Sequence, residues 1–437
     1  MAREMKDSGV EWIGEIPRNW DVHRLKTDFS FGKGLPITKE HLTDEGIDVI
    51  SYGQIHSKNN TMTSIDDGLI KHVDVSYSES NPEAATHIGD FIFADTSEDT
   101  EGCGNCVYID RPNVYAGYHT IILKSLLSLD NKYFAYLFKT DCWRSQLRAD
   151  AAGVKLFSIT KKMLAKCTTI VPEIDEQIKI TAFLDKECSH IDSIINKTRS
   201  TIEEYKALKQ SIITEAVTKG VRGDRPMKNS GIEWIGEIPE GWDTIKYGRK
   251  TTVKSNLVHP EDYPDYPQIS PDNIEKGNAK LLSNYRSVKD TGVISDNHLF
   301  HANQIVYSKV RPILNKLFIA EFDGLCSADM YPIETEYPAK LLVYIMLSEI
   351  FLAQVKMVTE DRVKMPKINQ EELASLVIVD IPMEEHLEIM EYLDEKCDNI
   401  DALIEQKGQL ITELESYKKS LIYEYVTGKK EVPGLCQ

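Results

Sequence analysis

The residues that could do chemistry are scattered along the chain and form no catalytic constellation. The 437 residues contain no Gly-x4-Gly-Lys-Ser/Thr loop for a triphosphate and no Gly-x-Gly-x-x-Gly turn after a strand. They also lack the Asn/Asp-Pro-Pro-aromatic stretch with which amino-methyltransferases hold a flipped base. Cys103-Gly104-Asn105-Cys106 has metal-ligand spacing, but no second Cys pair or His pair stands at a suitable distance. We therefore expect a turn with incidental thiols there, and neither a catalytic site nor a metal site.

Polar, basic and amide side chains stand instead near strand ends and in loops. Arg and Lys suit guanine edges and phosphates, whereas Asn and Gln suit adenine, so these residues could contact DNA. Ordinary solvated loops carry the same types, and His56 and His119 could equally be hydrogen-bonded structural residues. The candidate DNA-binding residues are Lys33, Tyr52, Gln54, His56, Thr96, Ser97, Tyr118, His119 and Lys155 in the first half, and Asp272, Asn273, Lys309, Arg311, Asn315, Lys316, Arg362 and Lys364 in the second.

The overall charge argues against an autonomous nucleic-acid binder. Asp plus Glu exceed Lys plus Arg by 69 − 51 = 18, whereas such binders normally present a basic surface. DNA binding therefore requires positive charge that is local, or that another subunit contributes.

The composition is that of a globular protein of two or three domains, with 41% apolar residues. The sequence has no run of 18 apolar residues, and no apolar segment follows the first charged residues. Its eight cysteines are scattered and do not form a disulfide framework. These features predict a cytoplasmic protein without a membrane-spanning segment.

The elements that must position the candidates begin with a long stretch, Asp175–Lys219, that occurs twice. Leu184 and Leu393 are 393 − 184 = 209 residues apart, and apolar residues recur in steps of four and three from each. A mean step of 3.5 residues is the period of a coiled-coil seam. The predicted seam residues are Leu184, Ile191, Ile195, Ile202, Ile212, Leu393, Ile400, Ile404, Ile411, Leu414 and Leu421.

Connectivity predicts that the two helices are antiparallel. A helix of this length carries the chain roughly 50 Å from the first lobe. The second helix starts after the second lobe and must run back to pair along its length. The pair would then act as a spacer with pseudo-two-fold symmetry, although a helical hairpin that merely dimerises is an alternative.

A second repeat opens each half of the chain. Lys6–Pro17 returns as Lys228–Pro239, with Trp12 matching Trp234 at an offset of 234 − 12 = 222. Its Gly and Pro residues indicate turns, and its tryptophans are expected to anchor this arm to its lobe.

Both lobes are predicted to be mixed α/β, whereas their interiors do not visibly repeat. In the first, a helix is expected at about Asn131–Arg148, and in the second at about Ala339–Val355. The expected strands are Asp48–Ser51, Asp90–Ala94, Cys106–Ile109 and Thr120–Lys124 in the first lobe, and Tyr266–Ile269, Gln304–Tyr307, Leu317–Ala320 and Met330–Ile333 in the second.

The arrangement resembles the specificity subunit of type I DNA restriction–modification enzymes over essentially the whole chain. The resemblance rests on the repeated arm Gly9–Pro17 with Trp20, on the helix openings Pro172–Gln177 and Phe183–Asp185, and on Tyr307–Pro312. Tyr392-Leu393-Asp394 echoes the first helix, although His386 stands where the first copy has Gln177.

The resemblance implies a non-catalytic subunit whose two target recognition domains each read half of a bipartite target in duplex DNA. Two methyltransferase subunits carrying S-adenosylmethionine would dock on the helices, and two translocase–nuclease subunits using ATP and Mg would join for cleavage. The alternative is a two-lobed scaffold that holds protein partners apart without binding DNA. The expected boundaries are 1–172 for the first domain with its arm at 5–21, 173–222 for the central helix, 223–382 for the second domain with its arm at 227–243, 383–430 for the C-terminal helix and 431–437 for a tail.

Overall fold

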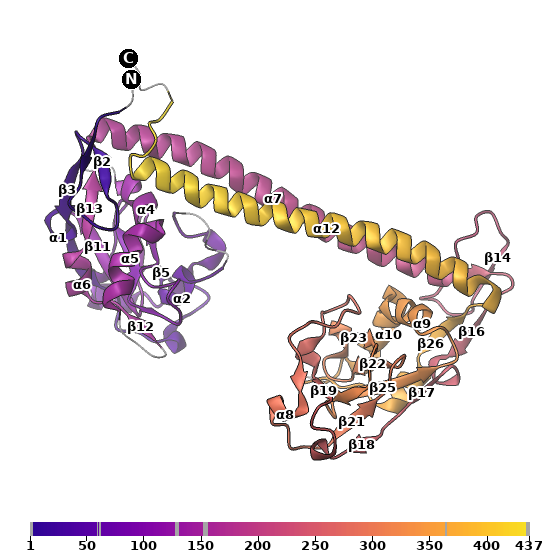
Figure 1. Cartoon of the computed structure of the whole chain (residues 1–437). Coiled ribbons are helices and arrows are strands. Elements are labelled where there is room, and N and C mark those ends of the chain that lie inside the picture. Colours follow the sequence, from indigo (N-terminus) through magenta and orange to yellow (C-terminus); the bar gives the residue numbers. More distant parts are fainter. Residues whose placement is uncertain are drawn as a thin grey trace. The chain divides into compact units, whose positions relative to one another are not determined.

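The chain folds into two compact units, Met1–Asn196 with Leu410–Gln437, and Lys197–Gln409. The computed structural model describes residues 3–58, 60, 63–126, 131–151, 156–362 and 365–433. Each unit contains one globular lobe and a part of both long helices, α7 (Ile174–Lys219) and α12 (Met383–Val426). In each unit α7 and α12 lie side by side (Figure 1).

In the first unit, the beginning of α7 pairs with the end of α12. Leu184, Cys188 and Ile191 share a buried cluster with Leu421 and Tyr425. Lys418 Nζ lies 2.7 Å from both carboxylate oxygens of Asp192, and the pair joins the two helices. Because residues early in α7 meet residues late in α12, the helices are antiparallel.

The second unit contains the matching half of the pair. Lys209 Nζ donates to both oxygens of Asp401, at 2.8 and 2.7 Å, and Ile213 shares a cluster with Leu393. Both ion pairs follow one register, since 209 + 401 = 192 + 418 = 610. The predicted antiparallel coiled coil is confirmed. Of its seam residues, Leu184, Ile191, Ile195, Leu393, Ile400 and Leu421 are buried and Ile202, Ile212, Ile404, Ile411 and Leu414 are half-buried.

The first lobe is built on a four-stranded sheet in the order β4-β11-β7-β9 and a three-stranded sheet in the order β10-β5-β6. Phe91, Phe134 and Phe138 belong to the main buried cluster of this unit. The strands are β1 (Met5–Asp7), β2 (Glu15–Pro17), β3 (Asp21–Arg24), β4 (Phe29–Lys33), β5 (Ile47–Ile50), β6 (Lys71–Val73), β7 (Phe91–Ala94), β8 (Thr96–Ser97), β9 (Cys106–Tyr108), β10 (Val114–Ala116), β11 (Thr120–Ser125), β12 (Phe157–Ser158) and β13 (Thr168–Val171), and the helices are α1 (Leu25–Asp28), α2 (Tyr52–Ile55), α3 (Ser76–Ser80), α4 (Asn131–Lys139), α5 (Asp141–Asp150) and α6 (Lys161–Lys166).

The second lobe has a four-stranded sheet in the order β17-β25-β22-β23 and a five-stranded sheet in the order β18-β21-β24-β19-β20. Leu341, Leu342 and Phe351 are buried against the first of these sheets. The strands are β14 (Met227–Asn229), β15 (Glu237–Pro239), β16 (Asp243–Lys246), β17 (Thr251–Val253), β18 (Leu257–Val258), β19 (Pro267–Ile269), β20 (Arg286–Ser287), β21 (Asn297–Phe300), β22 (Ile305–Ser308), β23 (Leu317–Ile319), β24 (Gly324–Cys326), β25 (Met330–Thr335) and β26 (Val377–Asp380), and the helices are α8 (Val288–Thr291), α9 (Ala339–Leu347), α10 (Glu349–Thr359) and α11 (Gln370–Ser375).

The two lobes share the topology of their central strands although their interior sequences differ, and the second lobe adds β18 and β21 to one sheet. β5 pairs in parallel with β10 and antiparallel with β6, as β19 pairs with β24 and β20. After the parallel pair, Gly117 N donates to Ile50 O at 2.7 Å and Ser327 N donates to Ile269 O at 2.9 Å. The duplication therefore includes the lobe interiors, where the sequence showed no repeat.

The eight expected strands are present within one or two residues of their predicted ends, whereas both expected helices are wrong in extent. The first breaks at Thr140, whose Oγ1 caps α5 by accepting from Trp143 N. The second breaks at Ser348, which caps α10 by accepting from Phe351 N. In both, a hydroxyl group replaces a backbone carbonyl as the acceptor and allows the chain to turn.

The repeated arms are held by a matching contact in each unit. Trp20 Nε1 donates to Glu176 Oε2 at 2.8 Å, and Trp242 Nε1 donates to Glu385 Oε1 at 2.9 Å. Both indoles are buried, as predicted for anchors. The same prediction is wrong for Trp234, which is 47% exposed.

Candidate nucleic-acid interface

Five candidates of the first lobe, Tyr52, His56, Thr96, Tyr118 and His119, lie together at one sheet edge and form the first loop cluster. The parallel strands β5 and β10 end at this edge, and they lead into α2 and the loop before β11. The Tyr52 ring centroid lies 5.5 Å from that of Tyr118 and 5.3 Å from that of His119. Parallel pairing thus brings residues distant in sequence to one place.

Hydrogen bonds fix His56 within this cluster. His56 Nε2 lies 2.8 Å from the Thr96 carbonyl oxygen, which can only accept, so this nitrogen carries the proton. Its Nδ1 lies 3.0 Å from Asn105 Nδ2 and accepts from that amide. The network therefore holds the imidazole in one orientation. Sequence inspection missed Asn105, because its partner is distant along the chain.

His119 is the outermost member of the cluster. Its side chain is exposed, its backbone has a left-handed φ of 55°, and its Nδ1 lies 3.2 Å from Asp95 Oδ1. Lys33, also exposed, ends β4 next to Gly34, whose N–H donates to Thr120 O at 3.5 Å. Burial raises the pKa of the Tyr118 phenol, which therefore stays protonated and able to donate a hydrogen bond.

Two other first-lobe candidates have local structural roles. Gln54 Oε1 accepts from Ser51 N at 2.8 Å in a capping box that starts α2. Ser97 is buried, and its hydroxyl donates to Asp99 O at 2.8 Å. Lys155 lies outside the described residues.

The second lobe has a cluster at the corresponding edge, which we call the second loop cluster: Asp272, Asn273, Lys309, Arg311 and Lys316. Asn273 Oδ1 accepts from Ser270 N at 2.8 Å in a capping box equivalent to that of Ser51 and Gln54. Lys316 Nζ donates to Pro271 O at 2.7 Å. Asp272 has a 99% exposed side chain.

Arg311 is the outward-facing cation of the second loop cluster. It is exposed and has a left-handed φ of 47°, an uncommon conformation for arginine. Its backbone N–H donates to Pro366 O at 2.8 Å, and within the described residues its guanidinium has neither an ion-pair nor a hydrogen-bond partner. Lys309 Nζ lies 5.1 Å from the Tyr331 ring centroid. The backbone therefore holds Arg311 in place, and its guanidinium, which has five N–H donors, is without a partner in the described part of the chain.

Backbone hydrogen bonds show which cluster positions correspond. Asp95 N donates to His119 O, and Lys309 N donates to Asp329 O, both at 3.0 Å. Lys309 of the second lobe therefore occupies the position of Asp95 in the first, and Asp329 occupies the position of His119. Asp329 Oδ1 in turn accepts from Lys367 Nζ at 2.8 Å. The charges at equivalent positions are different, so the two edges present different chemistry. Sequence inspection missed Asp95, Asp329 and Lys367, because tertiary pairing alone identifies them.

The three remaining candidates of the second lobe are not members of the second loop cluster. Asn315 is 1% exposed and donates to Met346 O at 2.9 Å, which makes it a core residue. The guanidinium of Arg362 donates to Glu372 and to Lys367 O. Lys364 lies outside the described residues.

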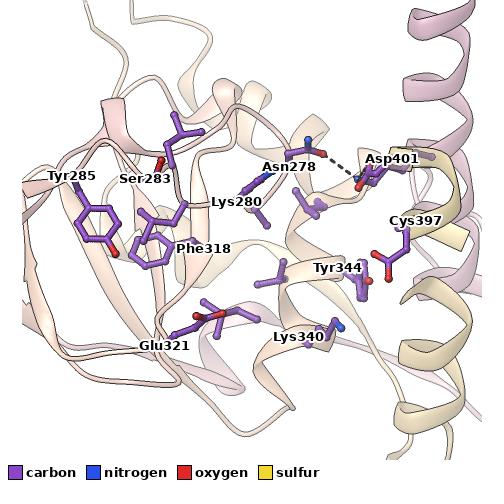
Figure 2. Close-up of a pocket in the computed structure, with 18 of the residues that line it drawn as sticks. Asn278, Lys280, Ser283, Tyr285, Phe318, Glu321, Lys340, Tyr344, Cys397 and Asp401 are labelled. Carbon is purple, nitrogen blue, oxygen red and sulfur yellow. Dashed lines mark hydrogen bonds and ion pairs between the residues drawn. The ribbon is translucent and has the colours of Figure 1, made fainter. Parts of the chain in front are cut away.

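A cavity of about 550 Å³ lies elsewhere in the second unit, between its lobe and the long helices (Figure 2). Asn278 faces Asp401 across it, and Lys209 Nζ donates to both, at 3.0 Å to Asn278. Tyr344 Oη and Lys340 Nζ donate to Asp394 at 2.6 and 2.7 Å. In the first unit Tyr136 and Lys132 hold Asp185 in the same way, at 2.7 and 2.6 Å. These contacts fasten each lobe to the coiled coil.

The described residues include no group of three or more His, Cys, Asp or Glu side chains placed to hold a metal ion. Cys103 and Cys106 are both buried, and burial raises the pKa of Cys106 to about 12.

Comparison with known proteins assigns the first lobe to a family. Residues 17–204 match the family model of the type I restriction modification DNA specificity domain. The first lobe is a type I DNA specificity domain. The resemblance found in the sequence is confirmed, because relatives of the chain as a whole are type I specificity subunits.

The relatives extend the similarity beyond this specificity domain. The EcoDI specificity subunit of Escherichia coli is 26% identical over 337 residues, 74% of each chain. The putative MjaX specificity subunit of Methanocaldococcus jannaschii is 24% identical over 446 residues, 96% of each chain. A solved chain, from work on complex assembly and conformational transition of the type I R-M system, matches with a TM-score of 0.68 at 14% identity. It covers 95% of this chain and 99% of the other, which confirms the fold.

Within the described residues, no helix by itself has the length and apolarity that a membrane crossing needs. The bent pair α9–α10, with an angle of 63°, meets the length and composition criteria jointly.

Proposed function

We propose that this chain is a non-catalytic DNA-reading subunit in which each lobe reads one half of a bipartite duplex target. One observation carries the proposal: the two lobes share a topology, and at the same sheet edge they present different side chains. The first loop cluster offers Tyr52, Tyr118 and His119, whereas the second offers Lys309 and Arg311. A shared frame with different donors and acceptors suits two different base sequences.

We further propose that the coiled coil sets the gap between the half-sites. The ion pairs Lys209–Asp401 and Lys418–Asp192 support this role, since both lie at the helix seam and both agree on one register. Polar residues at seam positions are a known means of fixing register. The Asp185 and Asp394 contacts attach each lobe to this frame.

Two exposed apolar pairs on the long helices suit the docking of methyltransferase subunits. Ile174 and Ile178 are 44% and 53% exposed at the start of α7, and Met383 and Leu387 are 82% and 63% exposed at the start of α12. The pairs are 383 − 174 = 209 residues apart, so the duplication supplies two equivalent sites. In this proposal two methyltransferase subunits bring S-adenosylmethionine, and two translocase–nuclease subunits bring ATP and Mg.

Methylome sequencing tests the proposal directly. A host that expresses this chain with its methyltransferase should acquire methylation at one split motif with a fixed gap. Complete absence of a split motif, with both subunits present and associated, would contradict it. Under the scaffold alternative, the reconstituted assembly would show no shift of DNA duplexes in a gel at stated salt.

A further inference from the structure

The first lobe carries a group of six exposed cations, which we call the basic shelf. It consists of Arg24, Lys26, Lys33, Lys161, Lys162 and Lys166, from β3, α1, β4 and α6. A net charge of −18 makes such a concentration unexpected in this chain.

Backbone contacts bring the parts of the basic shelf together. Leu25 N donates to Cys167 O at 2.8 Å, which joins α1 to the end of α6, and the Arg24 guanidinium donates to Lys166 O. Lys161 Nζ lies 3.4 Å from Phe31 O, two residues before Lys33. α1 and α6 lie next to each other (Figure 1).

No carboxylate within the described residues forms an ion pair with any of these six cations. The nearby Asp28 is fully buried and lies 3.0 Å from His23 Nδ1. The sequence from 151 to 172 contains neither Asp nor Glu. Some other cations of this unit are paired, for example Arg3 with Glu176 at 2.6 Å and Arg148 with Asp141 at 2.8 Å. The shelf therefore presents uncompensated positive charge.

The second lobe shows that the fold does not require the three lysines of α6. The offset of 370 − 161 = 209 places Gln370, Glu371 and Ser375 of α11 where α6 has Lys161, Lys162 and Lys166. α11 nevertheless packs on the segment Tyr247–Arg249, as α6 packs on α1, and its Leu373 is as fully buried as Leu164. A requirement for folding therefore does not explain the charge of the shelf.

The basic shelf adjoins the first loop cluster. Ile159, two residues before α6, donates its N–H to Asp95 O at 2.8 Å, and Asp95 contacts His119. On the other side, Lys33 precedes Gly34, which is bonded to Thr120 beside His119. DNA bound at the cluster would therefore bring its backbone over the shelf.

From this geometry we infer that the basic shelf binds phosphodiester groups of DNA beside the half-site read by the first lobe. The inference rests on the proposed function and adds a sequence-independent contact to it. Lysine ammonium groups act on phosphates as point charges, so they strengthen binding without selecting bases. The second lobe has Gln370 and Glu371 in place of Lys161 and Lys162 and so lacks these lysine contacts, and the salt dependence of binding is larger in the first lobe.

The experiment compares the reconstituted methyltransferase assembly containing the wild-type chain with one containing K161Q/K162Q/K166Q. Affinities for a cognate duplex and a random duplex are measured across a salt series. The slope of log K against log salt is negative, and each lost phosphate contact makes it shallower by about 0.9. The triple variant should therefore have a slope shallower by up to about 2.7. The loss should be similar on both duplexes, and the methylated motif should stay the same.

The matched control is K39Q/K71Q/K276Q, which removes the same charge from three exposed lysines outside the shelf. It should keep the wild-type slope. The inference is overturned by an unchanged slope in the shelf variant, by an equal loss in the control, or by failure of the shelf variant to join the methyltransferase, which would assign the shelf to a protein partner. A wild-type assembly that binds neither duplex would instead contradict the proposed function.

Discussion

At the scale of single residues, the backbone decides which candidates can reach a ligand. Gln54 and Asn273 have the right chemistry for adenine, yet each side-chain oxygen closes a capping box. Arg311 differs, because its side chain has no partner among the described residues and its N–H donates to Pro366 O, a bond that accompanies its left-handed φ of 47°. Uncommon backbone conformations of this kind are often found at functional sites.

Replacing Arg311 with Ala should weaken or relax recognition at one half-site only. A bidentate arginine–base contact contributes about 1–3 kcal/mol of discrimination, so methylation at the affected half should lose roughly 5- to 150-fold selectivity. Methylome sequencing of the variant measures the change position by position.

Arg311→Lys serves as the comparison, since it keeps the charge but loses the fork. It should retain affinity better than selectivity. Equal loss at both half-sites in either variant would identify Arg311 as a structural residue of the assembly.

At the scale of elements, each arm is fastened to a long helix by one carboxylate, the half-buried Glu176 in the first unit and the buried Glu385 in the second. Burial raises the pKa of Glu385, but hydrogen bonds from Trp242 and Arg225 outweigh it, and the pKa lies below its ordinary value of 4.5. The Arg225 guanidinium lies 2.7 Å from Glu385 Oε2 and stacks 4.7 Å from the Trp242 ring centroid. The arm of the second lobe therefore depends on an ionised Glu385.

Glu385→Gln should lower the stability of the chain by roughly 1–3 kcal/mol at neutral pH, because charge-assisted hydrogen bonds are lost. A carboxylate whose pKa is lower in the folded state stabilises that state fully at pH values above its unfolded-state pKa. This stabilisation is lost as the pH falls through the folded-state pKa. The difference from wild type should therefore be constant above about pH 4.5 and shrink below it. Denaturant midpoints across pH measure it.

The neighbouring Glu384 is exposed and provides the control. Glu384→Gln should change the midpoints little at any pH. A pH-independent difference between wild type and Glu385→Gln would show that loss of shape, and not loss of charge, destabilises the arm.

At the scale of the whole molecule, the length of the coiled coil is the quantity to vary. Ile202 and Gly408 share the common register, since 202 + 408 = 610. A matched heptad inserted after Ile202 and after Lys407 keeps the seam in phase and adds about 10 Å to the helix pair. The methylated motif should keep both half-sites and widen its gap by about three base pairs at 3.4 Å each.

A heptad inserted in α7 alone is the matched control. It displaces Lys209 from Asp401 while the first unit keeps its pairing, so methylation should fall sharply. An unchanged gap in the double insertion would contradict the spacer role of the coiled coil.

Much of this architecture could be predicted from the sequence because it depends on local periodicity. The seam residues, the antiparallel direction and the duplicated arm follow from a 3.5-residue repeat and from chain connectivity. The eight strands follow from local composition. The breaks at Thr140 and Ser348 were missed, because a hydroxyl cap inside an apolar helical pattern does not change the pattern.

The tertiary structure alone decided what the lobes present to a ligand. The equivalence of Asp95 with Lys309, the network around His56 and the convergence of six cations on one face all join segments far apart in the sequence. Sheet pairing and helix packing create such neighbourhoods, and neither leaves a periodic trace in the chain. The sequence by itself therefore determined the repeated frame, and tertiary packing determined which side chains of that frame meet and which remain free for a ligand.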